Sequence, residues 1–144
     1  NKYKVGEEIV DINIDSFSGI HYYLSNTYEV TFTVWGLTFR SAEAAYQSSK
    51  TKDIAERSIF QYLSPKEAVT KGLLLRKSLD FDEVKEDLMY EILYSKFSQN
   101  EVLLSKLLDT GARQLADENE YKDCVDVGKV LMQVREELKT QRKV

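Results

Sequence analysis

The segment from Ser41 to Lys50 contains the residues best suited to chemistry. It reads SAEAAYQSSK, so Glu43, Gln47 and Lys50 lie four and three residues apart. On an α-helix this spacing places the three side chains on one face, with about 10 Å of rise between the first and the last. A carboxylate and an amine in one cleft would supply an acid/base group and a reactive amine. The segment therefore predicts a catalytic helix face.

The same stripe is compatible with a solvent-exposed face that carries a loose Glu–Lys pair. Two features favour a site. The predicted helix directly follows a strand-rich segment, so its first turn would lie where loops can line a pocket. Tyr46 flanks the stripe, and small residues on the other side of the helix would let a neighbouring element approach closely.

The segment 16–26 reads SFSGIHYYLSN and is rich in aromatic residues. It is interpreted either as a loop that covers the core or as a lid that stacks a planar base between rings, with Tyr23 as a candidate contact. His21 is the only histidine of the chain, and Cys124 is the only cysteine. This composition argues against a zinc site and excludes an internal disulfide. We expect Cys124 to be a buried or half-buried thiol.

Composition places the chain among ordinary globular proteins. Its 144 residues suit one domain over residues 1–144, and 42% of them are hydrophobic and 31% charged. The net charge of −4 does not favour binding of long nucleic acid by counterion release, although a local basic groove would be compatible with it. No apolar run approaches the roughly 20 residues that span a bilayer, and no signal-peptide pattern is present. We expect a cytoplasmic protein that does not contact membranes.

The predicted elements change character at Ser41. Strand-like stretches cover 5–14, 28–34 and 37–39, with a turn at Trp35-Gly36-Leu37 in which Gly36 can adopt a positive φ. Ser41 is the predicted N-cap of a helix that continues to about Lys52. The fold class is therefore α+β and mostly helical, with a small N-terminal antiparallel sheet packed on five to six helices.

The remaining helices are predicted from caps and from apolar periodicity. The signals are an apolar piece over 54–63, a capping box at Ser64–Glu67 with a stop at Gly72, a long helix from about Asp82, a short helix between Asn100 and Gly111, and a last helix with one apolar face over 127–138.

Four blocks of residues, spanning roughly 17–138, follow a recognisable order. They are Leu24-Ser25-Asn26; Gly36–Phe39 with Ser41–Glu43, Ala45–Gln47 and Lys50; Ser64–Gly72 with Val84–Met89 and Lys96-Phe97; and Leu107–Gly111 with Gly128–Met132 and Arg135. In order and spacing the chain resembles the NADAR (YbiA-like) family, with the Glu, Gln and Lys of the second block as the central motif.

The resemblance implies an enzyme that hydrolyses an N-glycosidic bond to a phosphorylated or ADP-linked ribose. The substrates would be ribosylaminopyrimidine phosphates of the riboflavin pathway or ADP-ribosylated guanine, free or in nucleic acid. By similarity, Glu43 would be an acid/base group or transition-state stabiliser, and Lys50 an amine able to form a Schiff base with an opened ribose. Tyr46 and Gln47 would position the sugar, and Asn26 would be a further substrate-binding residue. This route requires no metal and no other cofactor.

The late segment LADENEYKDCVDVGKVLM departs from the family pattern, because it is shortened and lacks both the usual Trp and the Asn that normally lies shortly before the last helix. Asp117, Asn119 and Asp123 remain there as polar candidates, and Asp123 is the predicted substrate contact. The departure leaves two alternatives open. One is a degenerate NADAR module that binds nucleotide or ADP-ribose without turnover, and the other is a helical interaction protein. The oligomeric state cannot be predicted from these features.

Overall fold

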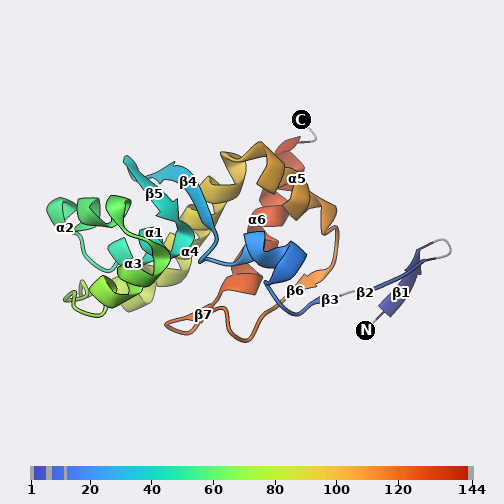
Figure 1. The fold of residues 1–144 in the computed structure, drawn as a ribbon, viewed down its shortest axis with the longest axis horizontal. Coiled ribbons are helices and arrows are strands. Elements are labelled where there is room, and N and C mark those ends of the chain that lie inside the picture. The colour runs from blue at the N-terminus through green and yellow to red at the C-terminus, as the bar shows by residue number, and fades with distance from the viewer. Residues whose placement is uncertain (1, 6–7, 12, 143–144) are drawn as a thin grey trace.

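A computed structural model describes residues 2–5, 8–11 and 13–142 of the chain (Figure 1). Its helices are η1 (Gly19–Leu24), α1 (Ala42–Ser48), α2 (Ile54–Ile59), η2 (Phe60–Tyr62), α3 (Pro65–Gly72), α4 (Phe81–Ser98), α5 (Glu101–Asp109) and α6 (Val127–Arg142). Its strands are β1 (Lys2–Val5), β2 (Glu8–Asp11), β3 (Asn13–Ile14), β4 (Glu29–Val34), β5 (Leu37–Ser41), β6 (Gln114–Leu115), β7 (Tyr121–Lys122) and β8 (Val125–Asp126). The predicted class, α+β and mostly helical, is confirmed.

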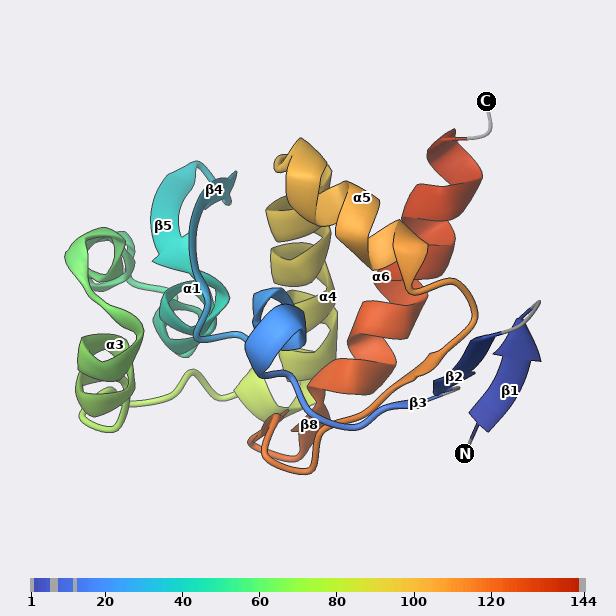
Figure 2. The ribbon, with the colours of Figure 1, turned by 45° about the vertical axis from the view of Figure 1, so that its right-hand side comes forward.

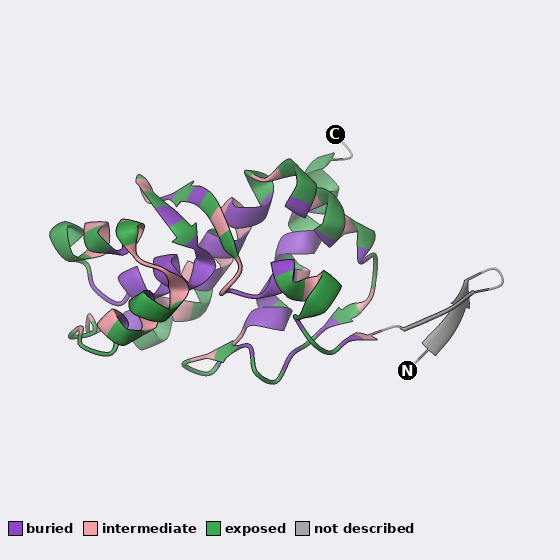
Figure 3. Ribbon diagram, in the orientation of Figure 1, coloured by how far each residue is buried: buried purple, intermediate pink, exposed green. Residues whose placement is uncertain are grey.

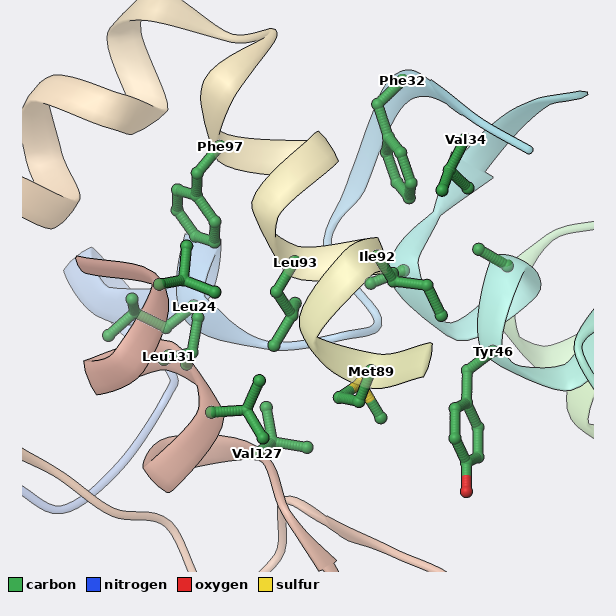
Figure 4. Packing of buried hydrophobic residues seen from close by; sticks show 14 of the residues in the cluster. Leu24, Phe32, Val34, Tyr46, Met89, Ile92, Leu93, Phe97, Val127 and Leu131 are labelled. Carbon is green, nitrogen blue, oxygen red and sulfur yellow. The ribbon is translucent and has the colours of Figure 1, made fainter. Parts of the chain in front are cut away.

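Helix α4 forms the centre of the molecule. It packs against α5 and α6 on one side and against α1 and the β4–β5 hairpin on the other (Figure 2). The buried face of α4 includes Met89, Ile92, Leu93 and Phe97, each with no exposed surface. These side chains lie between those of η1 and α6 and those of β4 and α1 (Figure 4). One hydrophobic core therefore fixes the position of α1.

Two helix starts agree with the caps predicted from the sequence. The Ser41 hydroxyl accepts a hydrogen bond from the backbone N–H of Ala44 at 3.0 Å. At α3, the Ser64 hydroxyl accepts from the N–H of Glu67 at 3.2 Å, and the Glu67 carboxylate accepts from the N–H of Ser64 at 2.9 Å. Each bond satisfies a backbone donor that the first helical turn leaves without a partner.

The first predicted helix is shorter than expected. It ends at Ser48 and not near Lys52, because the hydroxyls of Ser48 and Ser49 donate to the carbonyls of Ala45 and Tyr46 at 2.7 and 2.6 Å. Serine side chains that bond to the backbone compete with the helical hydrogen-bond ladder. Lys50 therefore lies in the turn after α1.

The β-structure is more dispersed than the single sheet that was predicted. The β4–β5 hairpin is antiparallel, and its two turn residues, Trp35 and Gly36, have φ of 54° and 76°. The predicted strand over 5–14 is instead divided, with β2 in one hairpin and β3 paired in parallel with the late strand β6; residues 6, 7 and 12 lie outside the described part. In the described part of the chain, separate two-stranded pairs replace a continuous sheet, and of these only β3–β6 joins distant parts of the chain.

Two further details differ from the sequence-based expectation. Ile54 and Ile59 of the predicted apolar piece are 66% and 44% exposed, and only Phe60 of that region has no exposed surface. Asn100 directly precedes α5 as expected, but its side-chain amide donates to the carbonyl of Lys96 at 2.7 Å and caps no backbone N–H of the helix. Among the described helices, none combines the length and the apolar character needed to cross a membrane.

Candidate functional site

Helix α1, which carries Glu43 and Gln47 and directly precedes Lys50, is buried along its whole length (Figure 3). Glu43 has no exposed surface, and Gln47 and Lys50 are only 5% and 7% exposed. The stripe is therefore not a solvent-exposed face. Because burying charged groups is costly unless they are paired, the partners of these residues determine what the site can do.

The Glu43 carboxylate is held from two sides. Its Oε2 accepts a hydrogen bond from Gln47 Nε2 at 2.8 Å, and its Oε1 forms an ion pair of 2.7 Å with Lys122 Nζ. The backbone N–H of Glu43 donates to the carbonyl of Asn26 at 2.9 Å. The spacing of four residues thus joins Glu43 and Gln47 as predicted, while Lys122 comes from the late part of the chain.

The position of Gln47 depends on the absence of a side chain at Gly72 of α3. A Cβ at that position would lie 1.9 Å from Gln47 Oε1. Gly72→Ala is therefore expected to displace the Gln47 amide, to weaken its hold on Glu43, and to destabilise the protein by about 1–3 kcal/mol. Thermal unfolding measures the loss of stability, and titration with ADP-ribose measures the effect of the displaced Gln47 amide on binding. Unchanged unfolding and binding would contradict the close packing of α3 on α1.

Asp123 connects two further predicted residues, Tyr46 of α1 and Lys50 of the turn after it. Its Oδ2 accepts a hydrogen bond from the Tyr46 hydroxyl at 2.9 Å and lies 3.6 Å from Lys50 Nζ. The Tyr46 ring is part of the core, and its hydroxyl points away from the packed apolar side chains (Figure 4). Burial and then the hydrogen bond to Asp123 raise the pKa of Tyr46, so its hydroxyl acts as a donor. Lys50, Tyr46 and Asp123 form one polar cluster beside Glu43.

The β7–β8 hairpin brings Lys122 and Asp123 onto α1. Lys122 pairs with Val125, and the two loop residues, Asp123 and Cys124, have φ of 51° and 72°. Two successive residues with positive φ are typical of a tight type I′ hairpin turn. Lys85 of α4 also donates to the Asp123 carbonyl, at 2.6 Å. The shortened late segment therefore still covers the site.

Cys124 is exposed at the tip of this hairpin, which corrects the expectation of a buried or half-buried thiol. Its place in the two-residue loop between β7 and β8 accounts for the exposure. Lys122 is not among the site residues predicted from the sequence. The sequence signal that could have identified the hairpin is the pattern YKDCVD. In it, short stretches of alternating apolar and polar residues lie on either side of a turn that contains Asp, a residue that tolerates positive φ.

The corner at Ser25 and Asn26 is surrounded by buried charged groups. Lys96 of α4 has no exposed surface and donates to the carbonyl of Ser25 at 3.0 Å. Its Nζ lies 5.0 Å from the centre of the Phe97 ring. Burial lowers the pKa of Lys96 to about 7. Glu120, which is 9% exposed, is the charged group that most offsets this effect.

The low pKa of Lys96 predicts a pH-dependent stability. The pKa is about 7 in the folded protein and ordinarily 10.5, so the unfolded chain binds more protons between these values. The free energy of unfolding should therefore rise with pH across that window, apart from other titrating groups. Lys96→Met should remove this rise, measured by urea unfolding at several pH values. Lys129→Met, at an exposed position, should retain it; equal slopes in both variants would refute the prediction.

Tyr23 is not brought to Glu43. Its hydroxyl donates to the carbonyl of Lys106 at 3.1 Å, and its ring lines a separate cavity of about 400 Å³ together with His21 and Arg113. Asn26 does lie at the site, where its carbonyl binds the N–H of Glu43. The predicted aromatic lid is thus a separate feature from the Glu43 cluster.

Asp117 has a structural partner rather than a place in the Glu43 cluster. Its carboxylate accepts from the backbone N–H groups of Phe17 and Asn119, both at 2.8 Å. These bonds tie the late loop to the segment before η1. Across the described residues, no group of three or more His, Cys, Asp or Glu side chains is placed to hold a metal ion.

Comparison with known proteins gives three similarities. Residues 16–125 match the model of the NADAR domain. A riboflavin biosynthesis protein of Vibrio vulnificus (strain YJ016) is 31% identical over an alignment that covers 82% of this chain and 36% of the relative, so the chain spans about a third of that protein. The NMR structure of the Escherichia coli protein YbiA superposes with a TM-score of 0.77 at 26% identity, covering 90% of this chain and 85% of that chain.

Proposed function

Because this chain belongs to the NADAR domain family, we propose that it is an N-glycosidase that hydrolyses the bond between a base and a phosphorylated or ADP-linked ribose. The observation that carries the proposal is the buried Glu43 carboxylate, held by Lys122 and Gln47 next to the Lys50–Asp123 pair. A carboxylate and an amine thus lie together, out of bulk water, on one short helix and the turn after it. Electrostatic interactions are stronger in such a place than in water.

The chemistry of the bond fits this arrangement. Cleavage between the anomeric carbon and a base nitrogen develops positive charge on the sugar. The Glu43 carboxylate, fixed by an ammonium group on one oxygen and an amide N–H on the other, would stabilise that charge. Its partners hold it in place before the reaction, so little reorganisation is needed when the charge appears.

Lys50 would act on the sugar itself. The anomeric carbon of an opened ribose is an aldehyde, which a neighbouring amine can trap as a Schiff base. Asp123 Oδ2 lies 3.6 Å from Lys50 Nζ and would balance the charge of the resulting iminium ion. The Tyr46 hydroxyl, which donates to the same carboxylate at 2.9 Å, would orient it.

The hairpin imposes a condition on substrate entry. Lys122 and Asp123 contact the same groups that a sugar would need. A sugar bound there must therefore share these groups with the hairpin tip, and its phosphate groups would take Lys122 as a further partner. These contacts of Lys122 with Glu43 and of Asp123 with Lys50 also support a second candidate function, in which the domain binds nucleotide or ADP-ribose without turnover.

Two substrate classes test the proposal. The purified protein is incubated with ribosylaminopyrimidine phosphates and with ADP-ribosylated guanine nucleotides, and chromatography measures free base. Release of base from either class supports the N-glycosidase, and the reactive class identifies the substrate. Saturable binding by calorimetry without release supports the binding module. If the protein neither binds these ligands nor releases base from them, both functions are ruled out for these ligands.

A further inference from the structure

A second cavity, between η1 and the end of α5, has no role in the chemistry proposed above. Its volume is about 400 Å³, and its lining includes His21 and Tyr23 of η1, Lys106 of α5 and Arg113 of the loop that follows α5. Helices α5 and α1 pack on different sides of α4, so this η1–α5 cavity is separate from the Glu43 cluster (Figure 2).

Hydrogen bonds hold the walls of the η1–α5 cavity in place. The Tyr23 hydroxyl donates to the carbonyl of Lys106 at 3.1 Å and joins η1 to α5. Arg135 of α6, which is 8% exposed, donates from Nη1 to Thr110 Oγ1 at 3.0 Å and to the Arg113 carbonyl at 2.9 Å. The N–H of Arg113 donates to the Thr110 carbonyl at 3.1 Å. The backbone that carries Lys106 and Arg113 is therefore positioned before a ligand binds.

The protein neutralises the positive groups of this cavity only in part. Among the described residues, the Nε of Arg113 is buried and has no hydrogen-bond partner. None of the ion pairs between described residues includes Arg113 or Lys106. The Nζ of Lys106 lies 5.6 Å from the centre of the Tyr23 ring. Asp109 is the one carboxylate among the described lining residues, so two permanent positive charges face one negative charge.

An anion with acceptor oxygens in several directions matches these donors. The guanidinium of Arg113 can bind two oxygens at once, and the ammonium of Lys106 adds a compact charge from another element. Burial and then the charge of Arg113 lower the pKa of His21, so its ring is neutral near pH 7 and donates through one nitrogen. A phosphate group presents oxygens in several directions, whereas a carboxylate presents two in one plane.

We propose that the η1–α5 cavity binds a phosphate group, with Arg113 and Lys106 as its main partners and His21 as a further donor. The phosphate belongs either to a free nucleotide or to the backbone of a nucleic acid. This inference goes beyond the proposed N-glycosidase function, because it requires no turnover at Glu43. In a chain with a net charge of −4, such a cavity supplies a local attraction for anions that the overall charge does not.

Inorganic phosphate and a short, unmodified oligothymidine strand are the two probes that test the proposal. Amide NMR shifts of the isotope-labelled protein locate the binding, and we expect saturable shifts at Thr110 and Arg113. Tighter binding of the strand than of phosphate, with a steep loss of affinity in salt, assigns the site to a nucleic-acid backbone. Equal or tighter binding of inorganic phosphate assigns it to small phosphate ligands.

The double variant Lys106→Gln/Arg113→Gln removes both charges from the cavity. Its matched control is Lys66→Gln/Arg76→Gln, which removes the same charge from two exposed positions elsewhere. Loss of the charge-assisted bonds should weaken binding by at least about 10-fold, whereas the control should bind as the wild type does. Circular dichroism checks that each variant is folded. Lys106→Glu, at an exposed position, leaves the Arg113 loop intact and should weaken binding as well.

The proposal is wrong if the two double variants lose affinity equally, because net charge alone would then explain binding. It is also wrong if the shifts are confined to Lys122 and Asp123, which would place the phosphate beside Glu43, or if neither probe binds. Base release is measured in a separate assay, so each of these results leaves the test of the N-glycosidase function unaffected.

Discussion

Glu43→Gln is expected to lower kcat/KM for base release by about 10²–10⁴-fold. The amide has the same shape but carries no charge, so it cannot stabilise a positive sugar. It also cannot accept from Gln47 and Lys122 with the strength of a carboxylate. Because Glu43 has no exposed surface, water cannot substitute for the missing charge. Initial rates of base release, measured with subsaturating substrate, give the ratio directly.

Glu86→Gln is the matched control for Glu43→Gln. Glu86 pairs with Lys129 at 3.2 Å, and both side chains are more than half exposed, so the loss of this pair should change neither rate nor stability measurably. Circular dichroism and thermal unfolding establish that each variant is folded. If folded Glu43→Gln released base at the wild-type rate, Glu43 would have no part in the chemistry.

Features that depend on residues within one turn of each other could be predicted from the sequence. Ser41 and Ser64 cap their helices through bonds to the N–H three residues on, so type and spacing define them. The same holds for the turn at Trp35 and Gly36, where one residue without a Cβ permits positive φ. The pairing of Glu43 with Gln47 belongs to this class as well.

Features formed by contacts between distant residues could not be predicted in this way. Tyr46 and Asp123 are 77 positions apart, and Lys122 reaches Glu43 over a similar separation. The turn that enables both contacts uses Asp and Cys at positive φ instead of the usual Asn-Gly, so it gives a weak signal. Lys96 is charged, and nothing in its local pattern indicates complete burial; the packing of α4 against Ser25 decides it.

The helix end shows the limit of periodicity arguments. The face shared by Glu43, Gln47 and Lys50 was predicted for a helix that continues to about Lys52, whereas α1 ends at Ser48. Lys50 is nevertheless buried, because the turn directs it toward Asp123. The predicted residues can thus lie close together although the helix that suggested their grouping ends early.

Borohydride added during turnover is expected to leave a covalent ribose adduct on Lys50. Reduction of a Schiff base converts the transient bond to the sugar into a stable secondary amine. Peptide mass spectrometry then locates the added mass. Lys50→Arg should show no adduct and should lose most of its activity, since a guanidinium keeps its proton and cannot attack an aldehyde.

Lys52→Arg is the control for this experiment, because Lys52 lies two residues away but is 66% exposed and pairs with Asp80. It should form the adduct on Lys50 and turn over as the wild type does. The lysine that carries the adduct also tests the role of the hairpin. An adduct on Lys122 with Lys50 unmodified would assign the role of the reactive amine to Lys122 of β7. Turnover with no adduct on any lysine would indicate that water attacks the anomeric carbon directly. Only modification of Lys50 agrees with a mechanism in which α1 and the turn after it carry both the carboxylate and the amine.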